Sequence, residues 1–100
     1  MENHHQKLRW ATAWAIKEAR DAVGMTQSQL AGFAGFSGGT IPRAEQSISD
    51  LTVIELVRIA AVLKTSPTEL MRRVEEEIQR GPRKPTTPSG RPRKKAKKRK

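Results

Sequence analysis

Residues 26–46 read TQSQLAGFAGFSGGTIPRAEQ, and this stretch decides the fold of the chain. Thr26 followed by Gln29 is a helix-start pattern, because each of the two side chains can bond a backbone amide of the first turn. Gly35 permits the positive φ angle of a tight turn. Ala31 is small enough for a second helix to cross close by. The stretch therefore predicts two short helices that cross steeply around a tight turn.

The same helix-start pattern recurs at three further places, which are Asn3 with Gln6, Thr52 with Glu55, and Ser66 with Glu69. Behind each start the apolar residues follow helical spacing, and Gly24 and Gly81 end the first and last of these helices. The first helix carries Leu8, Ile16 and Val23 on its apolar stripe. No alternating pattern typical of a strand is present. The sequence predicts an all-α domain of five short helices.

The charge of the chain divides at residue 80. Residues 1–80 carry ten Lys or Arg against ten Asp or Glu, whereas residues 81–100 carry ten Lys or Arg and no acid. Residues 81–100 also hold four of the six prolines, and Ala96 is their one apolar residue. Such a segment cannot bury enough apolar surface to offset its ordering entropy. We therefore expect a folded domain over residues 1–80 and a disordered basic tail over residues 81–100.

The composition argues against several classes of protein. The chain has no cysteine, so it has no disulfide framework and no thiolate nucleophile. No apolar run reaches the roughly 18 residues that a membrane span needs. His4 and His5 are adjacent, which is a poor zinc geometry, and the run from Glu75 to Glu77 is typical of a solvated helix end. We expect no metal, no cofactor, no small-molecule substrate and no enzyme. The net charge of +10 points instead to a nucleic acid, in the cytoplasm at the nucleoid.

Residues 16–70 resemble the XRE or Cro-type helix-turn-helix domain of phage and bacterial repressors, through IKEARDAVGMTQSQLAGFAGFS, TIPRAEQ and LTVIELVRIAAVLKTSPTEL. The resemblance implies an ion pair between Arg20 and Glu45 that holds the recognition helix. It also implies that Gln27, beside Thr26 at the start of the second helix, grips a DNA phosphate. The function implied is that of a DNA-binding transcriptional regulator, a repressor that binds double-stranded DNA as a homodimer.

By the same resemblance, the residues that reach base edges in the major groove are Ser37, Gly38, Gly39 and Arg43, with Thr40 nearer the DNA backbone. The two glycines have no side chain with which to read a base. Pro42 lacks the amide that would bond the carbonyl of Gly38, and a proline inside a helix costs about 3 kcal/mol. We therefore expect this helix either to start late, capped by Thr40, or to be kinked. Base readout then depends on Arg43.

Within the tail, residues 90–94 read GRPRK and resemble the core of an AT-hook, in which an extended backbone lies in a narrow A·T minor groove. Ser89 stands where the AT-hook normally has an arginine. The alternatives are that the tail binds phosphates without reading sequence, or that it serves only solubility. The tail residues assigned to DNA are Arg91, Arg93, Lys94 and Lys95.

Two other functions fit the same residues. The first is a protein-interaction module, such as an antitoxin or anti-repressor, with a degenerate recognition helix. The second is a nucleoid-type architectural protein in which the tail dominates. Trp10 and Trp14 either pack against the last helix or form a patch for a partner, and Phe33 either covers the first helix or marks a contact.

Overall fold

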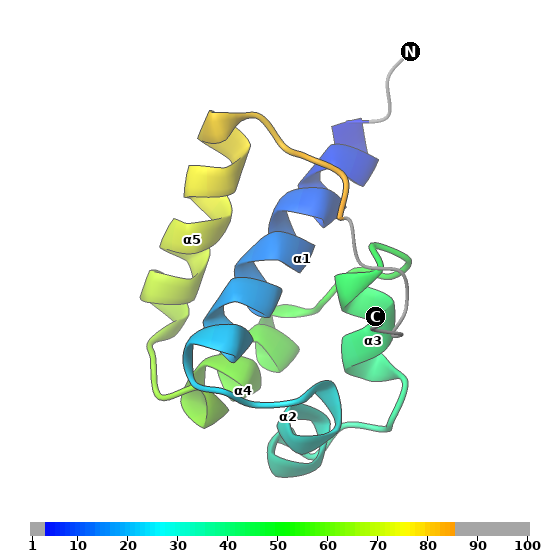
Figure 1. The fold of residues 1–100 in the computed structure, drawn as a ribbon, viewed down its shortest axis with the longest axis vertical. Coiled ribbons are helices and arrows are strands. Elements are labelled where there is room, and N and C mark those ends of the chain that lie inside the picture. Colours follow the sequence, from blue (N-terminus) through cyan, green and yellow to red (C-terminus); the bar gives the residue numbers. More distant parts are fainter. Residues whose placement is uncertain (1–3, 86–100) are drawn as a thin grey trace, which may run out of the picture.

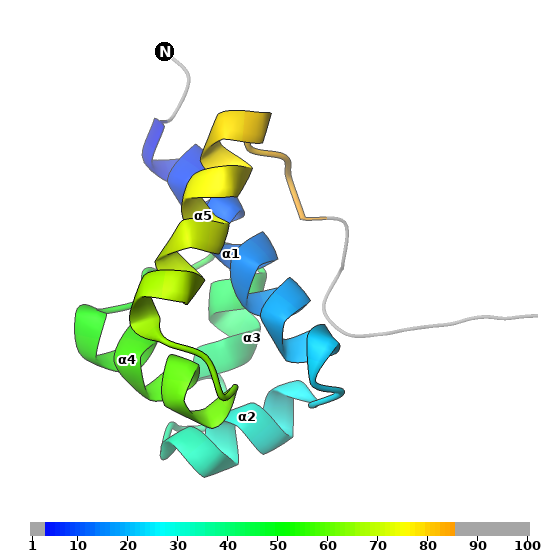
Figure 2. The same cartoon turned by 90° about the vertical axis from the view of Figure 1, so that its left-hand side faces the viewer.

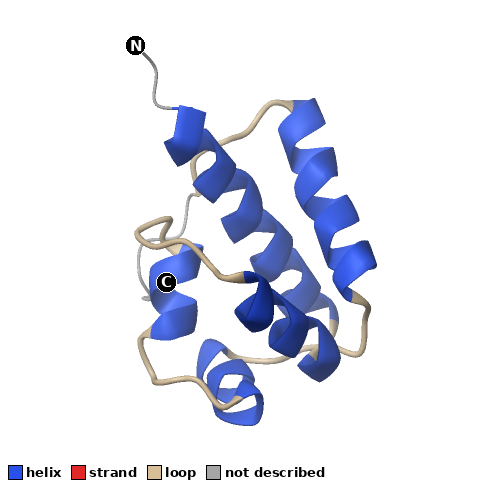
Figure 3. Ribbon diagram, turned by 180° about the vertical axis from the view of Figure 1, so that it is seen from behind, coloured by secondary structure: helices blue, strands red, loops and turns tan. Residues whose placement is uncertain are grey.

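The computed structural model describes residues 4–85, and this part of the chain contains five helices and no strand (Figure 1). The helices are α1 (His4–Ala22), α2 (Gln27–Ala34), α3 (Thr40–Glu45), α4 (Val53–Val62) and α5 (Pro67–Arg80). α1 and α5 lie side by side and run in opposite directions, while α3 lies on the other side of α1 (Figures 1 and 2). Seen from behind, the helices are joined by short loops (Figure 3). The prediction of an all-α domain with five helices is confirmed.

The predicted helix starts at Thr52 and Ser66 are both present. Thr52 Oγ1 accepts the amide of Glu55 at 3.0 Å, and the Glu55 carboxylate accepts the amide of Thr52 at 2.8 Å. Ser66 Oγ accepts the amide of Glu69 at 3.0 Å, but the Glu69 carboxylate binds Arg72 instead of returning to the cap. One arm of this second cap is therefore exchanged for a surface ion pair. The predicted start at Asn3 lies outside the residues that the structure describes.

A small aliphatic core joins all five helices. The largest fully buried apolar side chains are Ile16, Leu30, Ile41, Ile59 and Leu70. A second cluster of Ala11, Ala15 and Val74 lies between α1 and α5, where the short alanine side chains let the helices approach closely. Val23 was predicted on the apolar stripe but is 47% exposed, because α1 ends at Ala22 before Val23 can face the core.

The acidic run on α5 is only partly a solvated surface. Glu75 and Glu76 are exposed, but Glu77 is buried, with 2% of its surface accessible. The prediction of a solvated helix end is therefore wrong for Glu77. The reason is geometric: successive helical residues are rotated by about 100°, and Glu77 falls on the same buried face of α5 as Leu70 and Val74, whereas Glu75 and Glu76 do not.

The chain just after α5 returns to α1 at Arg83. The tail was expected to be disordered from residue 81; the structure describes residues 81–85, where Trp14 Nε1 donates a hydrogen bond to the carbonyl of Arg83 at 3.0 Å. Trp14 and Trp10 are both half-buried. Trp14 thus contacts its own chain just beyond α5. The expected DNA contacts Arg91, Arg93, Lys94 and Lys95 lie outside the described residues.

Candidate nucleic-acid interface

The turn between α2 and α3 has the geometry that the sequence predicts. Gly35 adopts a left-handed conformation with φ 79° and caps the end of α2. The amide of Phe36 then bonds the carbonyl of Ala31 at 2.9 Å. Ala31 is buried in the core with Leu30 and Ile41, so α2 and α3 cross around small and aliphatic side chains. The crossing fixes α3 in position while its outer surface stays open.

α3 starts late, which explains how it accommodates Pro42. Its first residue is Thr40, and the amide of Arg43 makes the first bond of α-helical spacing, to the carbonyl of Gly39 at 3.1 Å. Pro42 therefore falls in the first turn, where a backbone amide has no intrahelical acceptor in any case. The expectation of a late start, rather than a kink, is the one that the backbone follows.

Thr40 does not cap α3, so that part of the expectation is wrong. The residue before the helix is Gly39, which has no side chain to cap with, and Thr40 lies inside the first turn. The Thr40 hydroxyl instead shares a hydrogen bond of 3.1 Å with the hydroxyl of Ser37. A pair of hydroxyls uses one proton for this bond, so the second proton can still be donated outward.

The exposed surface of α3 offers one long basic side chain. Arg43 is exposed, and a methyl group added at Gly39 would meet its guanidinium. The guanidinium therefore lies back over the backbone of Gly39. Within the described part of the chain, nothing lies within 4 Å of the space that a side chain at Gly38 would enter. Residues 4–85 leave the surface around Arg43 uncovered, and a rotation of this side chain would change which polar groups α3 exposes.

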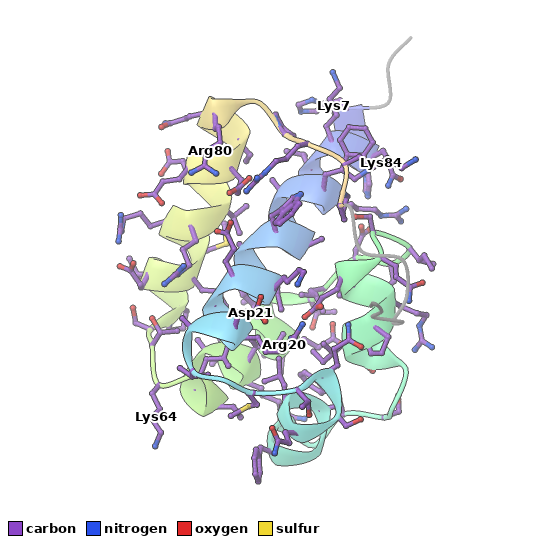
Figure 4. All side chains as sticks on the ribbon, viewed as in Figure 1. Lys7, Arg20, Asp21, Lys64, Arg80 and Lys84 are labelled. Atoms are coloured by element: carbon purple, nitrogen blue, oxygen red, sulfur yellow. The ribbon has the colours of Figure 1, made fainter. Side chains whose placement is uncertain are left out.

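A buried ion pair joins the end of α3 to α1. Arg20 donates from Nε and Nη2 to the two carboxylate oxygens of Glu45, at 2.8 and 2.9 Å, and from Nη1 to the carbonyl of Met25 at 2.7 Å. The side chain of Arg20 is 11% exposed and that of Glu45 is 5% exposed. Figure 4 shows Arg20 near the C-terminal end of α1. The residues named by the resemblance are thus in contact, in the two-pronged geometry that arginine makes with a carboxylate.

Electrostatics keep this pair charged. Burial by itself would lower the pKa of the Arg20 guanidinium, but the hydrogen bonds and charge of Glu45, with the charge of Asp21, outweigh burial and raise the pKa above its ordinary value. The pair therefore acts as a fixed structural link at every pH at which the carboxylate is ionised.

The side chain of Gln27 was expected to contact DNA, but in the structure it contacts Glu45. Its Nε2 donates to Glu45 Oε1 at 2.9 Å, so the side chain joins the buried ion pair. The resemblance assigns Gln27 to a DNA phosphate, yet the structure gives its amide group a contact inside the protein. Thr26 is likewise engaged, because Oγ1 accepts the Gln29 amide at 3.0 Å and its own amide donates to Gln29 Oε1 at 2.9 Å. Both residues help to build the start of α2.

The loop after α3 is tied to the start of α1 by contacts that the sequence did not reveal. Arg9 Nε donates to Asp50 Oδ1 at 2.7 Å, and His5 Nε2 lies 2.9 Å from the same oxygen. The hydrogen bond from Arg9, followed by that of His5, lowers the pKa of Asp50 below its ordinary value. Gln6 Nε2 adds a bond of 3.1 Å to the carbonyl of Ser47. The residues in each contact are about 41 to 45 positions apart, so no local sequence pattern predicts these contacts.

Other classes of site find no support in the described part of the chain. Among residues 4–85, no group of three or more His, Cys, Asp or Glu side chains could hold a metal ion. None of the helices there combines the length and the apolar character needed to cross a membrane. Phe33 on α2 is 70% exposed, so it does not cover α1.

Comparisons with known proteins agree with this geometry. Residues 16–70 match the model of the helix-turn-helix family HTH_3. A crystal structure of a variant of the restriction-modification controller protein C.Esp1396I is 27% identical, with a TM-score of 0.69 over 74% of this chain and 96% of that one. The clp gene regulator ClgR from Corynebacterium glutamicum is 21% identical, with a TM-score of 0.68 over 72% of this chain and 77% of that one.

The controller protein C.AhdI from Aeromonas hydrophila is 22% identical, with a TM-score of 0.64 over 68% of this chain and 99% of that one. No curated protein matches the sequence. The family match spans more than half of the chain and includes the whole of α2, the turn and α3. The chain therefore belongs to the HTH_3 family of helix-turn-helix domains and is a DNA-binding regulator of the XRE type.

Proposed function

We propose that the protein is a transcriptional repressor that binds a pseudo-palindromic operator as a homodimer and acts at the nucleoid. The observation that carries this proposal is the bare outer surface of α3 around Arg43, on a helix held to α1 by the pair of Arg20 and Glu45. A rigid short helix with one free guanidinium suits the major groove, where arginine pairs with O6 and N7 of guanine.

The contacts with the DNA backbone come from groups around α3. The outward proton of the Ser37 and Thr40 hydroxyl pair is a donor for a phosphate oxygen. Gln27 and Thr26 remain candidates at the start of α2, but a phosphate contact by Gln27 would require its amide to leave Glu45. Residues 26–50 contain Arg43 as their one Lys or Arg, so the domain itself supplies little positive charge.

The tail supplies the missing charge. Its basic residues, among them Arg91, Arg93, Lys94 and Lys95, would neutralise phosphates and release counterions, with a salt slope of about −0.9 per contact. The GRPRK stretch would add a preference for A·T-rich DNA if it enters a minor groove. Phosphate contacts position a protein, so the tail would raise affinity more than selectivity.

An apolar face on α4 and α5 supports the homodimer. Its exposed side chains are Val53 at 74%, Ile54 at 64%, Val57 at 43%, Met71 at 48% and Ile78 at 38%. The face continues into a groove that Leu56 and Val74 help to line. A contiguous apolar face of this kind marks an interaction site, and a dimer formed through it would have to place the two copies of α3 about one DNA turn apart, roughly 34 Å, to fit successive major grooves.

A selection of binding sites from random duplexes tests the proposal. The native chain should enrich a two-fold symmetric site, and Arg43→Ala should weaken binding to that site by about 1 to 3 kcal/mol and remove the preference at one position per half-site. Lys64→Ala is the matched control, because Lys64 is exposed on the far side of the molecule from α3 (Figure 4). An equal loss on every duplex would make Arg43 a phosphate contact.

A salt titration separates the tail from the domain. Replacing the eight Lys and Arg of residues 91–100 by Gln should make the slope of log affinity against log salt shallower by about 4 if half of them engage. The ratio of operator to random binding should stay nearly unchanged. An unchanged slope would remove the tail from the proposal.

The glycines at 38 and 39 favour a second candidate, a protein-interaction module that no longer reads bases. An architectural binder is the third, favoured by the tail charge. The selection separates them: no enriched site with retained affinity and a steep salt slope indicates the architectural binder, whereas weak binding to every duplex indicates the interaction module.

A further inference from the structure

The chain turns back onto the domain directly after α5. Gly81 has φ 104°, a left-handed region that favours glycine, and it redirects residues 82–85 across α1. We call residues 81–85 the strap. Figures 1 and 2 show the strap leaving the end of α5 and passing over α1. In Figure 4 Arg80 lies at the C-terminal end of α5, whereas Lys84 lies on the other side of α1, the side of α3.

One residue of the strap binds the buried acid of α5. Arg83 donates from Nε to Glu77 Oε1 and from Nη2 to Glu77 Oε2, both at 3.2 Å, and Arg80 Nη1 adds a bond of 3.0 Å. The Glu77 side chain is 2% exposed. A buried carboxylate is costly unless charged donors bind it. Arg83 therefore stabilises the ionised Glu77, and the same hydrogen bonds hold the strap against α5.

The same arginine also binds α1. Its Nη2 donates to Glu18 Oε2 at 3.1 Å, and its Cζ lies 3.9 Å from the centre of the Trp14 ring, a cation–π contact. Trp14 Nε1 donates to the carbonyl of Arg83 at 3.0 Å. This last bond fixes the main chain at Arg83, in addition to the bonds that fix its side chain. We call Arg83 with Glu18, Glu77 and Trp14 the Arg83 clamp.

We propose that the Arg83 clamp is a positioning device, which fixes the point from which the basic tail departs and so aims the tail at DNA beside the groove that α3 enters. This inference rests on the proposed function, in which α3 and the tail both contact DNA. Residues 86–100 carry eight Lys or Arg and no acid, and 15 residues reach at most about 50 Å. A fixed origin on the α3 side of α1 therefore decides which phosphates the tail can reach.

A measurement of DNA-binding affinity alone is an insensitive test of the clamp. Releasing it lengthens the segment beyond the last held residue from 15 residues to 20. The local concentration of the basic residues at the DNA would fall with roughly the −3/2 power of that length, which gives only about a 1.5-fold loss of affinity. The place where the tail meets the DNA responds more strongly, because the origin itself moves from α1 to the end of α5. The experiment must therefore read position along the DNA.

Cysteine-directed DNA cleavage gives that reading. The native chain has no cysteine, so Thr86→Cys in the full chain provides a single attachment point for an iron–EDTA group just past the strap. On the selected operator the tethered group should cut within a few base pairs at one place per half-site. Arg83→Ala should broaden the cut region about two-fold or move it, because the tail origin is released.

Lys84→Ala is the matched control, since it removes the same charge one residue along without touching the clamp contacts. Its cleavage pattern should equal that of the Thr86→Cys chain in which Arg83 and Lys84 are both intact. Glu18→Gln, at an exposed position, is a second variant that weakens the clamp and should broaden the cut in the same direction to a lesser extent. Thermal melts verify that each variant is folded, and the emission of Trp14, in a Trp10→Phe background, reports whether the clamp is open, as expected for Arg83→Ala, or closed, as expected for Lys84→Ala.

Identical cleavage patterns for Arg83→Ala and Lys84→Ala would overturn the clamp, whatever the tail does. A different result would contradict the proposed function of the tail. That result is an unchanged slope of log affinity against log salt when the eight tail charges are removed. A narrow cut that depends on Arg83 supports the clamp even then.

Discussion

Arg20 and Glu45 meet through two parallel hydrogen bonds in a place where neither side chain is more than 11% exposed, so α1 and α3 share one buried link. Breaking such a link from one side leaves the other charge buried. Arg20→Ala should therefore destabilise the domain by about 3 kcal/mol, since Gln27 offers Glu45 only one neutral donor.

Chemical denaturation of Arg20→Ala, Glu45→Gln and the double variant measures the coupling in a double-mutant cycle. Lys17→Ala is the control, because it breaks an exposed pair with Asp21 at 3.4 Å and should cost less than about 1 kcal/mol. Additive losses in the cycle would show that the pair is not coupled.

Gly38 is a position where a base-reading side chain can be restored. Its φ is not positive and the space beyond it is open, so Gly38→Asn should leave the melting temperature nearly unchanged. On DNA, the new amide should change the preferred base at one position per half-site, because asparagine pairs with adenine. A repeated site selection measures this; the same base preference as the native chain would place Gly38 away from the groove.

Pro42 distinguishes a first-turn proline from an interior one by the sign of a stability change. In the first turn the ring breaks no helical bond, so Pro42→Ala should lower stability by about 0.4 to 1 kcal/mol by freeing the unfolded chain. A proline that disrupted a longer helix would give the reverse sign, a gain of up to about 3 kcal/mol. Urea denaturation of the two chains decides between them.

Ser47 is held in a left-handed conformation, with φ 64°, and its buried hydroxyl has no hydrogen-bond partner among residues 4–85. Ser47→Gly removes both penalties and should stabilise the domain by about 1 to 3 kcal/mol. Lys64→Gly is the matched control, since Lys64 has φ 60° but an exposed side chain. Equal gains in thermal unfolding would assign the whole effect to the backbone.

Asp50 gives the loop after α3 a dependence on acid. Its bonds from Arg9 and His5 lower its pKa in the folded chain, so the ionised form is favoured by folding. The stabilisation is full above the ordinary pKa of 3.8 and is lost as the pH falls through the lowered folded value. The difference in melting temperature between the native chain and Asp50→Asn should therefore be constant near neutral pH and shrink below about pH 4.

Local patterns predicted most of the fold. Helix starts at Thr26, Thr52 and Ser66 and the turn at Gly35 depend on neighbours within a few residues, and each is present. Contacts between residues far apart in the sequence were harder to predict. Gln27 was assigned outward because the stretch around it does not reveal that Glu45, 18 residues away, lies within reach.

The strap was the largest omission. Composition marks residues 81–100 as unable to form a core, and that argument is sound for the segment as a whole. It does not hold for Arg83, because this guanidinium contacts a buried carboxylate and an aromatic ring. A composition averaged over 20 residues cannot reveal the contacts of one side chain. Trp14, which is half-buried, donates to the main-chain carbonyl of the same Arg83.

The brevity of α3 sets how much information it can take from DNA. Six residues rise only about 9 Å, which spans about three base pairs at 3.4 Å each. Two such helices on a dimer would read about six base pairs, a combination that recurs by chance once in about 4,000 base pairs, against the million or more competing sites of a genome. If the chain binds as the proposed dimer, its operators would be distinguished by half-site spacing and duplex flexibility as much as by their base sequence.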